Sequence, residues 1–273
     1  FLKSCKINKI KYAKNSYRCW CLPTFNEKHY MRRKIIRFTA FFKGIILIAK
    51  PHVLLGWLRH PFLIASNTLS LTKWVAIQDK KNIFNDFYTP IRDNSKRTQL
   101  YLFVFDKLNL KDEAIDYLEF GVFNGNSFKW WISKCINCGS RFYGFDTFIG
   151  LPENWGTYKK GEMSSDIPTV NDSRGEFVKG LFQDTLYDFI SRVNLKSEKR
   201  KIIHFDADLF SSTLFVLTSL APYFKKGDIL FFDEFNVPNH EFFAFKIFSE
   251  SFYVKTKLLG AVNNYYQVAL IIE

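Results

Sequence analysis

Short apolar runs alternate with amphipathic segments along the last two thirds of the chain. Apolar or alternating runs of about four to eight residues are typical of strands, and apolar positions three or four residues apart are typical of helices. These patterns predict strands at residues 115–122, 141–145, 176–181, 201–205, 228–232, 252–258 and 265–272. They predict helices at residues 96–110, 127–135, 185–193, 212–224 and 240–249.

Strands that alternate with helices indicate an α/β fold with a mostly parallel sheet covered on both faces. The last two predicted strands follow each other without a long helix between them, as in a terminal antiparallel hairpin. We therefore expect a Rossmann-like fold with a mostly parallel seven-stranded sheet and a terminal antiparallel strand. In such sheets, ligands bind outside the carboxyl ends of the strands.

The first third of the chain has a different pattern. Residues 38–89 predict two or three short helices, broken near Pro51 and Pro61 and ending before Pro90. We divide the chain into a basic, helical region at residues 1–95 and an α/β domain at residues 96–273. The apolar stretch at residues 38–49 is too short to span a bilayer and contains a lysine, so no transmembrane helix is predicted.

Positive charge is concentrated in the N-terminal region. Residues 1–97 hold 20 lysines and arginines against 4 acidic residues, whereas residues 98–273 hold 19 against 22. This excess suits an anionic membrane surface, an acidic polymer or a nucleic acid, and a solvated basic face is the alternative without a partner. With 47% hydrophobic residues, the composition excludes an intrinsically disordered chain.

The chain has five cysteines, which is an odd number and too few for a secreted disulfide scaffold. We interpret them as thiols in a reducing compartment. The expected location is the cytoplasm, at the inner face of a membrane if the basic region docks there. The sequence leaves the oligomeric state open, a homo-oligomer included.

The first predicted strand of the α/β domain runs into a glycine-bearing turn. Gly121 and Gly125 stand between Glu119 and a helix that starts near Ser127. Small residues let a ligand approach the backbone, and a helix N-terminus favours polar or anionic groups. Asp146 ends the second strand, where a carboxylate can accept hydrogen bonds from ribose hydroxyls. Its alternative role is to cap a turn.

Four acidic residues follow the fourth and fifth strands of this domain. Asp206 and Asp208 come after one strand, and Asp233 and Glu234 come after the next. Carboxylates this close repel one another, so either a cation binds or one acid keeps a proton. Oxygen ligands of this kind favour Mg²⁺ or Ca²⁺.

Five sequence blocks stand in this order: Glu119-Phe-Gly-Val-Phe-Asn-Gly, Tyr143-Gly-Phe-Asp-Thr-Phe-Ile-Gly-Leu-Pro152, Gly180-Leu-Phe-Gln-Asp-Thr-Leu186, His204-Phe-Asp-Ala-Asp-Leu-Phe-Ser-Ser-Thr213 and Asp233-Glu. Together they resemble the macrocin O-methyltransferase family along residues 97–273. The resemblance implies a class I methyltransferase that uses S-adenosylmethionine, commonly with Mg²⁺, to methylate sugar hydroxyls. The family usually has an Asp-Asp pair where this chain has Asp233-Glu234.

The resemblance also implies roles for single residues. The implied cofactor-binding residues are Glu119, Gly121, Gly125, Ser127, Asp146, Thr147, Phe182 and Asp206. Asp146 would hold the ribose, and Phe182 would lie near the adenine. The implied metal ligands are Asp206, Asp233 and Glu234. Asp208 would be the general base, and His240 at a predicted helix start is the alternative base.

The sequence therefore predicts an O-methyltransferase for a sugar hydroxyl of a glycan, glycolipid or glycosylated metabolite. The segment at residues 150–175, which contains Trp155 and Tyr158, is long enough to form a lid over the acceptor, or a surface loop. Two alternatives stay open at this point. One is a nucleic-acid methyltransferase, and the other is a non-enzymatic protein that binds the cofactor or a partner through the same fold.

Overall fold

The computed structural model describes residues 25–273, with side chains from residue 29 onward. The chain divides into two units, residues 1–59 and residues 60–273. Cys135 and Cys138 are free thiols, whereas Cys5, Cys19 and Cys21 lie outside the described residues.

The first unit is helical where it is described. Its helices are α1 (Phe25–Ala49), α2 (His52–Leu55) and the 3₁₀ helix η1 (Gly56–Leu58). No side chain between residues 29 and 58 is buried. The chain breaks at Lys50, which has a positive φ of 49°, directly before Pro51. The expected break near Pro51 is therefore present.

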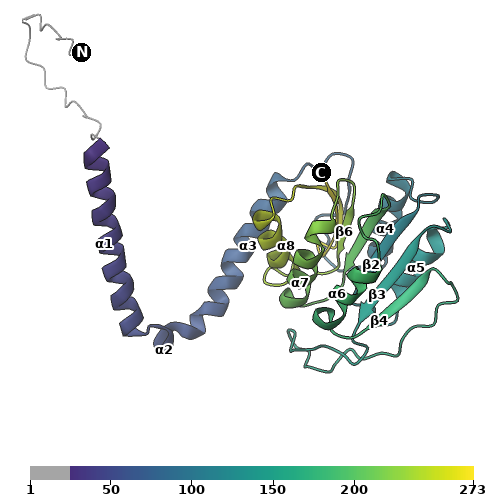
Figure 1. Ribbon diagram of the computed structural model, residues 1–273, viewed down its shortest axis with the longest axis horizontal. Helices are drawn as coiled ribbons and strands as arrows, with labels where there is room; N and C mark the ends of the chain where they lie inside the picture. The colour runs from purple at the N-terminus through teal and green to yellow at the C-terminus, as the bar shows by residue number, and fades with distance from the viewer. Residues whose placement is uncertain (1–24) are drawn as a thin grey trace, which may run out of the picture. The chain divides into compact units, whose positions relative to one another are not determined.

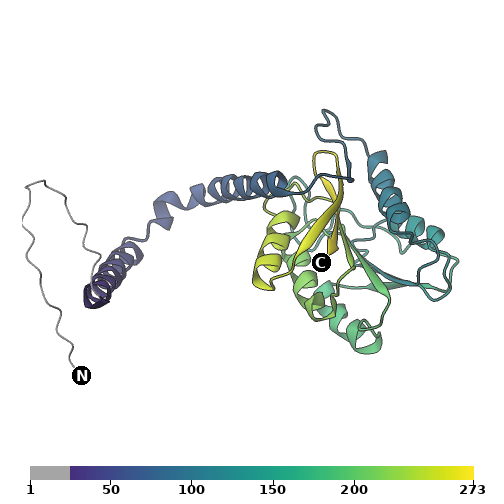
Figure 2. The ribbon, with the colours of Figure 1, turned by 90° about the horizontal axis from the view of Figure 1, so that it is seen from above.

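The second unit is an α/β domain, shown from two directions in Figures 1 and 2. In chain order its elements are α3 (Arg59–Ile77), β1 (Phe84–Asn85), α4 (Ser95–Lys107), β2 (Ile115–Phe120), α5 (Asn126–Lys134), β3 (Arg141–Asp146), β4 (Gly175–Lys179), α6 (Phe182–Arg192), β5 (Arg200–Phe205), α7 (Phe210–Leu220), η2 (Ala221–Tyr223), β6 (Ile229–Phe232), α8 (Glu241–Ser251), β7 (Thr256–Val262) and β8 (Gln267–Ile272).

The eight strands form one sheet in the order β1-β7-β8-β6-β5-β2-β3-β4. Strand β8 is antiparallel to β6 and β7, and the other strand pairs are parallel. The prediction of a Rossmann-like, mostly parallel sheet with a terminal antiparallel hairpin is confirmed. The two-residue strand β1, which no periodic pattern marks, adds an eighth strand beside β7.

Helices cover both faces of the sheet, so the chain has two apolar cores. On one face, α6, α7 and α8 pack against Leu118, Phe120 and their neighbours (Figure 1). On the other face, α4 and α5 pack against Tyr117 and Phe142. All six residues of β2 are buried because this central strand is covered on both faces.

Two details differ from the sequence-based elements. The break expected near Pro61 lies slightly earlier, at η1, and Pro61 itself lies in the first turn of α3, where its missing N–H group has no helical partner to lose. The strand expected at residues 252–258 begins only at Thr256. The aromatic residues Phe252 and Tyr253 extend the apolar pattern toward α8, but both are exposed in the turn that follows this helix.

The last half of α3 packs on the sheet domain. Leu71 belongs to the larger core, and Trp74 contacts Phe235 with ring centroids 4.9 Å apart. Trp74 also meets Phe245 edge to face. The second unit therefore starts near residue 60, which differs from the boundary expected at residue 95, because apolar side chains in residues 60–95 complete the core.

Trp74→Ala should lower the free energy of unfolding of the full chain by about 2–3 kcal/mol, because a large aromatic side chain leaves a partly buried position. Urea denaturation followed by circular dichroism measures this change. The matched control is Trp57→Ala in η1, where the side chain is 74% exposed and its loss should change stability by less than about 0.5 kcal/mol. Equal effects of the two substitutions would contradict the packing of α3 on the domain.

Candidate functional site

The carboxyl ends of the central strands lie at one level. Gly121, Asp206 and Asp233 each follow a strand and donate a backbone N–H to a carbonyl of the neighbouring strand, at N···O distances of 2.9, 2.9 and 3.0 Å. The turns that follow β2, β5 and β6 therefore start side by side. This is the edge at which open parallel sheets bind ligands.

The turn after β2 is very close to the turn after β5. Gly121 has a positive φ of 93°, and a Cβ atom here would lie 1.8 Å from the backbone oxygen of Asp206. Only glycine fits this position. Gly125, with a φ of 72°, precedes α5, and a Cβ here would lie 2.9 Å from the ring of Pro168. Both predicted glycines therefore shape the turn through their lack of a side chain.

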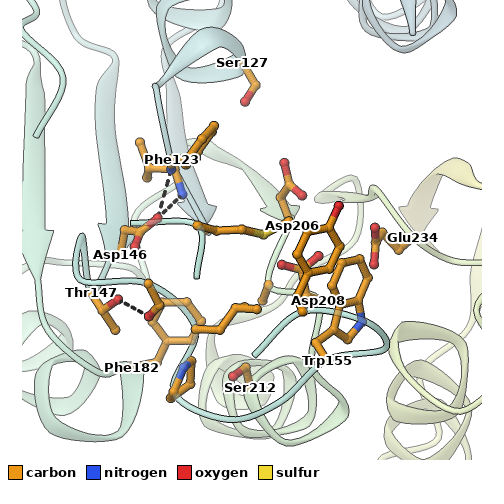
Figure 3. Close-up of a pocket in the computed structure, with 18 of the residues that line it drawn as sticks. Phe123, Ser127, Asp146, Thr147, Trp155, Phe182, Asp206, Asp208, Ser212 and Glu234 are labelled. Carbon is orange, nitrogen blue, oxygen red and sulfur yellow. Dashed lines mark hydrogen bonds between the residues drawn. The ribbon is translucent and has the colours of Figure 1, made fainter. Parts of the chain in front are cut away.

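Asp146 holds the same turn from the neighbouring strand. Its Oδ2 accepts hydrogen bonds from the backbone N–H groups of Val122 and Phe123 at 2.8 and 2.9 Å, as Figure 3 shows. Its Oδ1 accepts one from the N–H of Phe148 at 2.8 Å. Asp146 thus caps the turn, and Oδ1 keeps one lone pair without a hydrogen bond from the turn.

A cavity of about 510 Å³ opens above these strand ends. Eight of the predicted site residues line it: Gly121, Ser127, Asp146, Thr147, Phe182, Asp206, Asp208 and Glu234. In Figure 3, Asp146, Thr147 and Phe182 lie at one side of the cavity, and Asp208, Glu234 and Trp155 lie at the other. Glu119, Gly125 and Asp233 do not line the cavity.

Glu119 lies beneath the glycine-bearing turn and not on the cavity wall. Its carboxylate accepts hydrogen bonds from the hydroxyls of Ser127 and of Tyr117, the latter at 2.9 Å. Burial raises the pKa of Glu119 to about 8. We conclude that Glu119 supports the start of α5 through Ser127 and does not itself meet a ligand in the cavity.

His204 continues this buried polar chain. Its Nδ1 lies 3.0 Å from the hydroxyl of Tyr117, and its Nε2 lies 3.1 Å from the hydroxyl of Tyr101 on α4. Burial lowers the pKa of His204 to about 3, so the ring is neutral. A neutral imidazole donates from one nitrogen and accepts at the other, so both tyrosine contacts are satisfied.

Arg97 on α4 reaches the acidic edge of the sheet. Its Nη1 lies 2.9 Å from Oδ2 of Asp233 and 3.4 Å from Oδ2 of Asp206. Burial raises the pKa of both aspartates, and the guanidinium opposes this effect by favouring their charged forms. The cation that four neighbouring carboxylates require is therefore present in the chain itself.

The three predicted metal ligands do not converge on one point. Asp206 and Asp233 face Arg97, whereas Glu234 accepts a hydrogen bond from the hydroxyl of Tyr266. Among the described residues, the one group with metal-ligand spacing joins Asp206 and Asp233 to His204, with donor atoms within 4.8 Å of one another. Both nitrogens of His204 already contact tyrosine hydroxyls. The arrangement does not fit a three-carboxylate magnesium site, because a guanidinium lies between two of its ligands.

Protons supply the rest of the charge balance. Burial, followed by the nearby charge of Asp208, raises the pKa of Glu234 to about 8. Oδ1 of Asp233 and Oε2 of Glu234 are buried without a hydrogen-bond partner in the described part of the chain. A proton retained on Glu234 reduces the negative charge at this end of the cavity.

Asp208 is placed for proton transfer. It lines the cavity in a left-handed conformation with a φ of 60°, which few side chains other than Asp and Asn tolerate. Burial raises its pKa to about 6, close to neutral pH. His240, the alternative base, does not line the cavity, and burial lowers its pKa. The geometry therefore favours Asp208 over His240.

The segment after β3 forms one wall of the cavity. Trp155 and Tyr158 stack with ring centroids 5.3 Å apart, and both line the cavity. Ser165 donates a hydrogen bond to the carbonyl of Phe123 at 3.0 Å, which ties the segment to the glycine-bearing turn. The segment therefore lines the cavity, and its role as a lid over an acceptor stays a prediction.

Sequence patterns miss three side chains of the site. Arg97 lies in a helix predicted from its apolar face alone, and its charge is one of many in the N-terminal third. Arg92 lies 3.4 Å above the ring of Tyr266, and both residues line the cavity. The spacing of the acidic residues indicates that a counter-charge is needed. It does not indicate that Arg97 supplies this charge.

Comparisons with known proteins agree with this architecture. Residues 118–235 match the family model of a methyltransferase domain, a range that contains the glycine-bearing turn and all four acidic residues of the edge. No curated protein sequence matches the chain.

Solved methyltransferase structures share the fold. The calicheamicin methyltransferase CalS11 is similar with a TM-score of 0.51 and 20% identity, over 76% of this chain and 91% of that chain. The O-methyltransferase NovP is similar with a TM-score of 0.47 and 16% identity, over 64% and 78% of the two chains. The similarity to CalS11 and the match to the methyltransferase domain model show that the second unit has a Rossmann-like methyltransferase fold, and the finer resemblance to the macrocin family stays a prediction.

Arg97→Met should create an affinity for divalent cations that the native chain lacks. The substitution keeps most of the apolar stem but leaves Asp206 and Asp233 without a counter-charge, so a bound cation would then stabilise the fold. We expect millimolar Mg²⁺ to raise the melting temperature of this variant by several degrees and to leave that of the native chain unchanged. Arg92→Met, at the same cavity but outside the carboxylate pair, is the control. Equal stabilisation of the native chain by Mg²⁺ would show that Arg97 does not occupy the cation position.

Proposed function

We propose that the second unit transfers a methyl group from S-adenosylmethionine to a hydroxyl group of a sugar-containing acceptor. The observation that carries the proposal is a single cavity with a glycine-bearing turn at one side and a carboxylate of raised pKa, Asp208, at the other. The methyltransferase domain match over residues 118–235 supports the same reaction class. When bound, the cofactor supplies an electrophilic methyl group on a sulfonium.

The residues at the turn side suit a nucleoside with an amino-acid tail. Gly121 exposes backbone to the cavity, the free lone pair of Asp146 can accept a ribose hydroxyl, and Phe182 offers an apolar ring for a base. Phe182 is held by an edge-to-face contact with Phe120 at 5.3 Å. The cavity volume lies in the range that encloses a ligand of this size.

The residues at the other side suit a sugar hydroxyl. Asp208 is mostly ionised at neutral pH and can take the proton that the hydroxyl loses. The stacked rings of Trp155 and Tyr158 give a flat apolar surface of the kind that packs against the C–H face of a sugar. CalS11, in a second structure of it, is described as a TDP-rhamnose 3'-O-methyltransferase.

In this proposal, Arg97 takes the place that the sequence assigns to magnesium. Its guanidinium bridges Asp206 and Asp233 and provides fixed positive charge at the cavity. Fixed charges that need no rearrangement during a reaction are an effective source of electrostatic stabilisation. Methyl transfer is accordingly expected to continue in the presence of a chelator.

Gly121→Ala should abolish the binding of S-adenosylmethionine, because the new Cβ would meet the backbone of Asp206 at the cofactor turn. Isothermal titration calorimetry with the full chain measures this binding. The control is Gly156→Ala, which also has a positive φ but has no atom within 4 Å of the added Cβ. Circular dichroism confirms that both variants are folded. Absence of binding to the native chain would favour a non-enzymatic role for the fold.

Asp208→Asn should lower methyl transfer about 10²–10⁴-fold while cofactor binding stays unchanged, because only the proton acceptor is lost. Transfer of radiolabelled methyl groups to a panel of nucleotide sugars and glycolipids measures turnover. Because burial raises the pKa of Asp208 to about 6, the native rate should increase with pH up to about 7 and fall below pH 6 as the carboxylate is protonated. A variant that keeps the native rate would exclude Asp208 as the base.

A further inference from the structure

The first unit presents a large apolar surface that no described part of the chain covers. Along α1, the exposed apolar side chains are Tyr30, Met31, Ile35, Ile36, Phe38, Phe41, Phe42, Ile45, Ile46, Leu47 and Ile48. Leu47 and Ile48 are 76% and 82% exposed. Soluble monomers rarely expose continuous apolar patches of this extent, so the surface indicates a binding partner.

The following helices continue the pattern. The exposed apolar residues here are Val53, Leu54, Leu55 and Trp57 in α2 and η1, and Phe62, Ile64 and Leu69 in α3. In the second unit, Leu71 and Trp74 of α3 are packed in the core, so the change from exposed to packed side chains occurs within this helix. We call the exposed side chains from residue 30 to residue 64 the apolar segment.

Basic residues are arranged along the same helix. Arg32 and Lys43 are eleven residues apart, which is about three helical turns, so they lie on one face of α1. Arg33, Lys34 and Arg37 add charge at the N-terminal half, and α1 contains no acidic residue from residue 29 onward. Helices that combine large apolar side chains with lysine and arginine are typical of the interface of an anionic membrane.

Length and composition agree with this reading. No single helix in the described residues is long and apolar enough to cross a membrane, whereas the pair His29–Ala49 and His52–Ile77 reaches that threshold when taken together. The break at Lys50 and Pro51 lies between these two helices. By length and composition, such a bent pair suits a broken span or a re-entrant loop as well as a surface helix, and in each case lysine and arginine side chains can extend to the headgroups.

We infer that the apolar segment binds the surface of an anionic lipid bilayer and anchors the methyltransferase domain there. The apolar side chains supply the burial, and the basic side chains of α1 supply attraction to acidic headgroups. A basic helix with this many large apolar side chains does not match a nucleic acid, which would meet the charge but leave the apolar face in water. A lipid surface accommodates both features at once.

Flotation of the full chain with lipid vesicles tests the inference. We expect binding to phosphatidylcholine vesicles that contain phosphatidylglycerol and about hundredfold weaker binding after Arg32→Gln, Arg33→Gln and Arg37→Gln combined. The matched control replaces Lys159, Lys160 and Lys226, three exposed lysines of the second unit, with glutamine and should bind as the native chain does. Equal binding by both triple variants would overturn the role of the α1 charges.

A second pair of variants tests the apolar contribution. Ile45→Asp combined with Ile48→Asp should abolish vesicle binding, whereas Ile136→Asp combined with Tyr253→Asp, at exposed positions of the second unit, should not. Binding of S-adenosylmethionine, measured on all variants, shows that the domain is intact. Absence of vesicle binding by the native chain would overturn the inference. This holds also if the native chain instead forms dimers through α1 or binds RNA.

Discussion

The ion pair that joins Arg97 to Asp206 and Asp233 is the interaction on which the acidic edge of the sheet depends. Parallel strands bring their carboxyl ends together, so acidic residues that follow neighbouring strands become buried close to one another. A cation or bound protons must then balance the charge. Arg97 supplies a cation from α4, and Glu234, whose pKa is raised, keeps a proton, so groups of the chain itself reduce the negative charge of this edge.

Helix α4 connects this edge to the glycine-bearing turn. One turn after Arg97, Tyr101 contacts His204, which in turn contacts Tyr117, and Tyr117 donates to Glu119 beneath the glycine-bearing turn. Buried polar groups of this kind are stable only when each has a partner, so displacement of any member would leave others unsatisfied. The acidic edge and the glycine-bearing turn are therefore joined through α4 and a chain of buried polar groups.

The two units differ in how they obtain stability. The second unit buries the apolar faces of its helices on both sides of a sheet. Helix α1 has no buried side chain from residue 29 onward, and an isolated helix gains little from its backbone hydrogen bonds in water. A lipid surface would supply the apolar contact that the rest of the described chain does not supply. The proposed methyl transfer depends on the cavity of the second unit, whereas the proposed membrane binding depends on the exposed side chains of the apolar segment.

The sequence by itself determined the order of strands and helices, the glycine-bearing turn and the positions of the acidic residues at the strand ends. These features follow from local patterns, because a period of about two or 3.6 residues sets both the type of element and the face that it buries. Spacing along the chain was also sufficient to show that four carboxylates needed a counter-charge.

Only the tertiary structure decided which groups meet. Arg97 is 109 and 136 residues from the aspartates that it pairs with, Glu119 lies under the turn instead of in the cavity, and Trp74 moves the domain boundary toward residue 60. No local periodicity encodes such contacts, because they depend on how elements far apart in the sequence pack together. The sequence shows that the acidic residues need a counter-charge. Only the packing of α4 on the sheet shows that Arg97 supplies it.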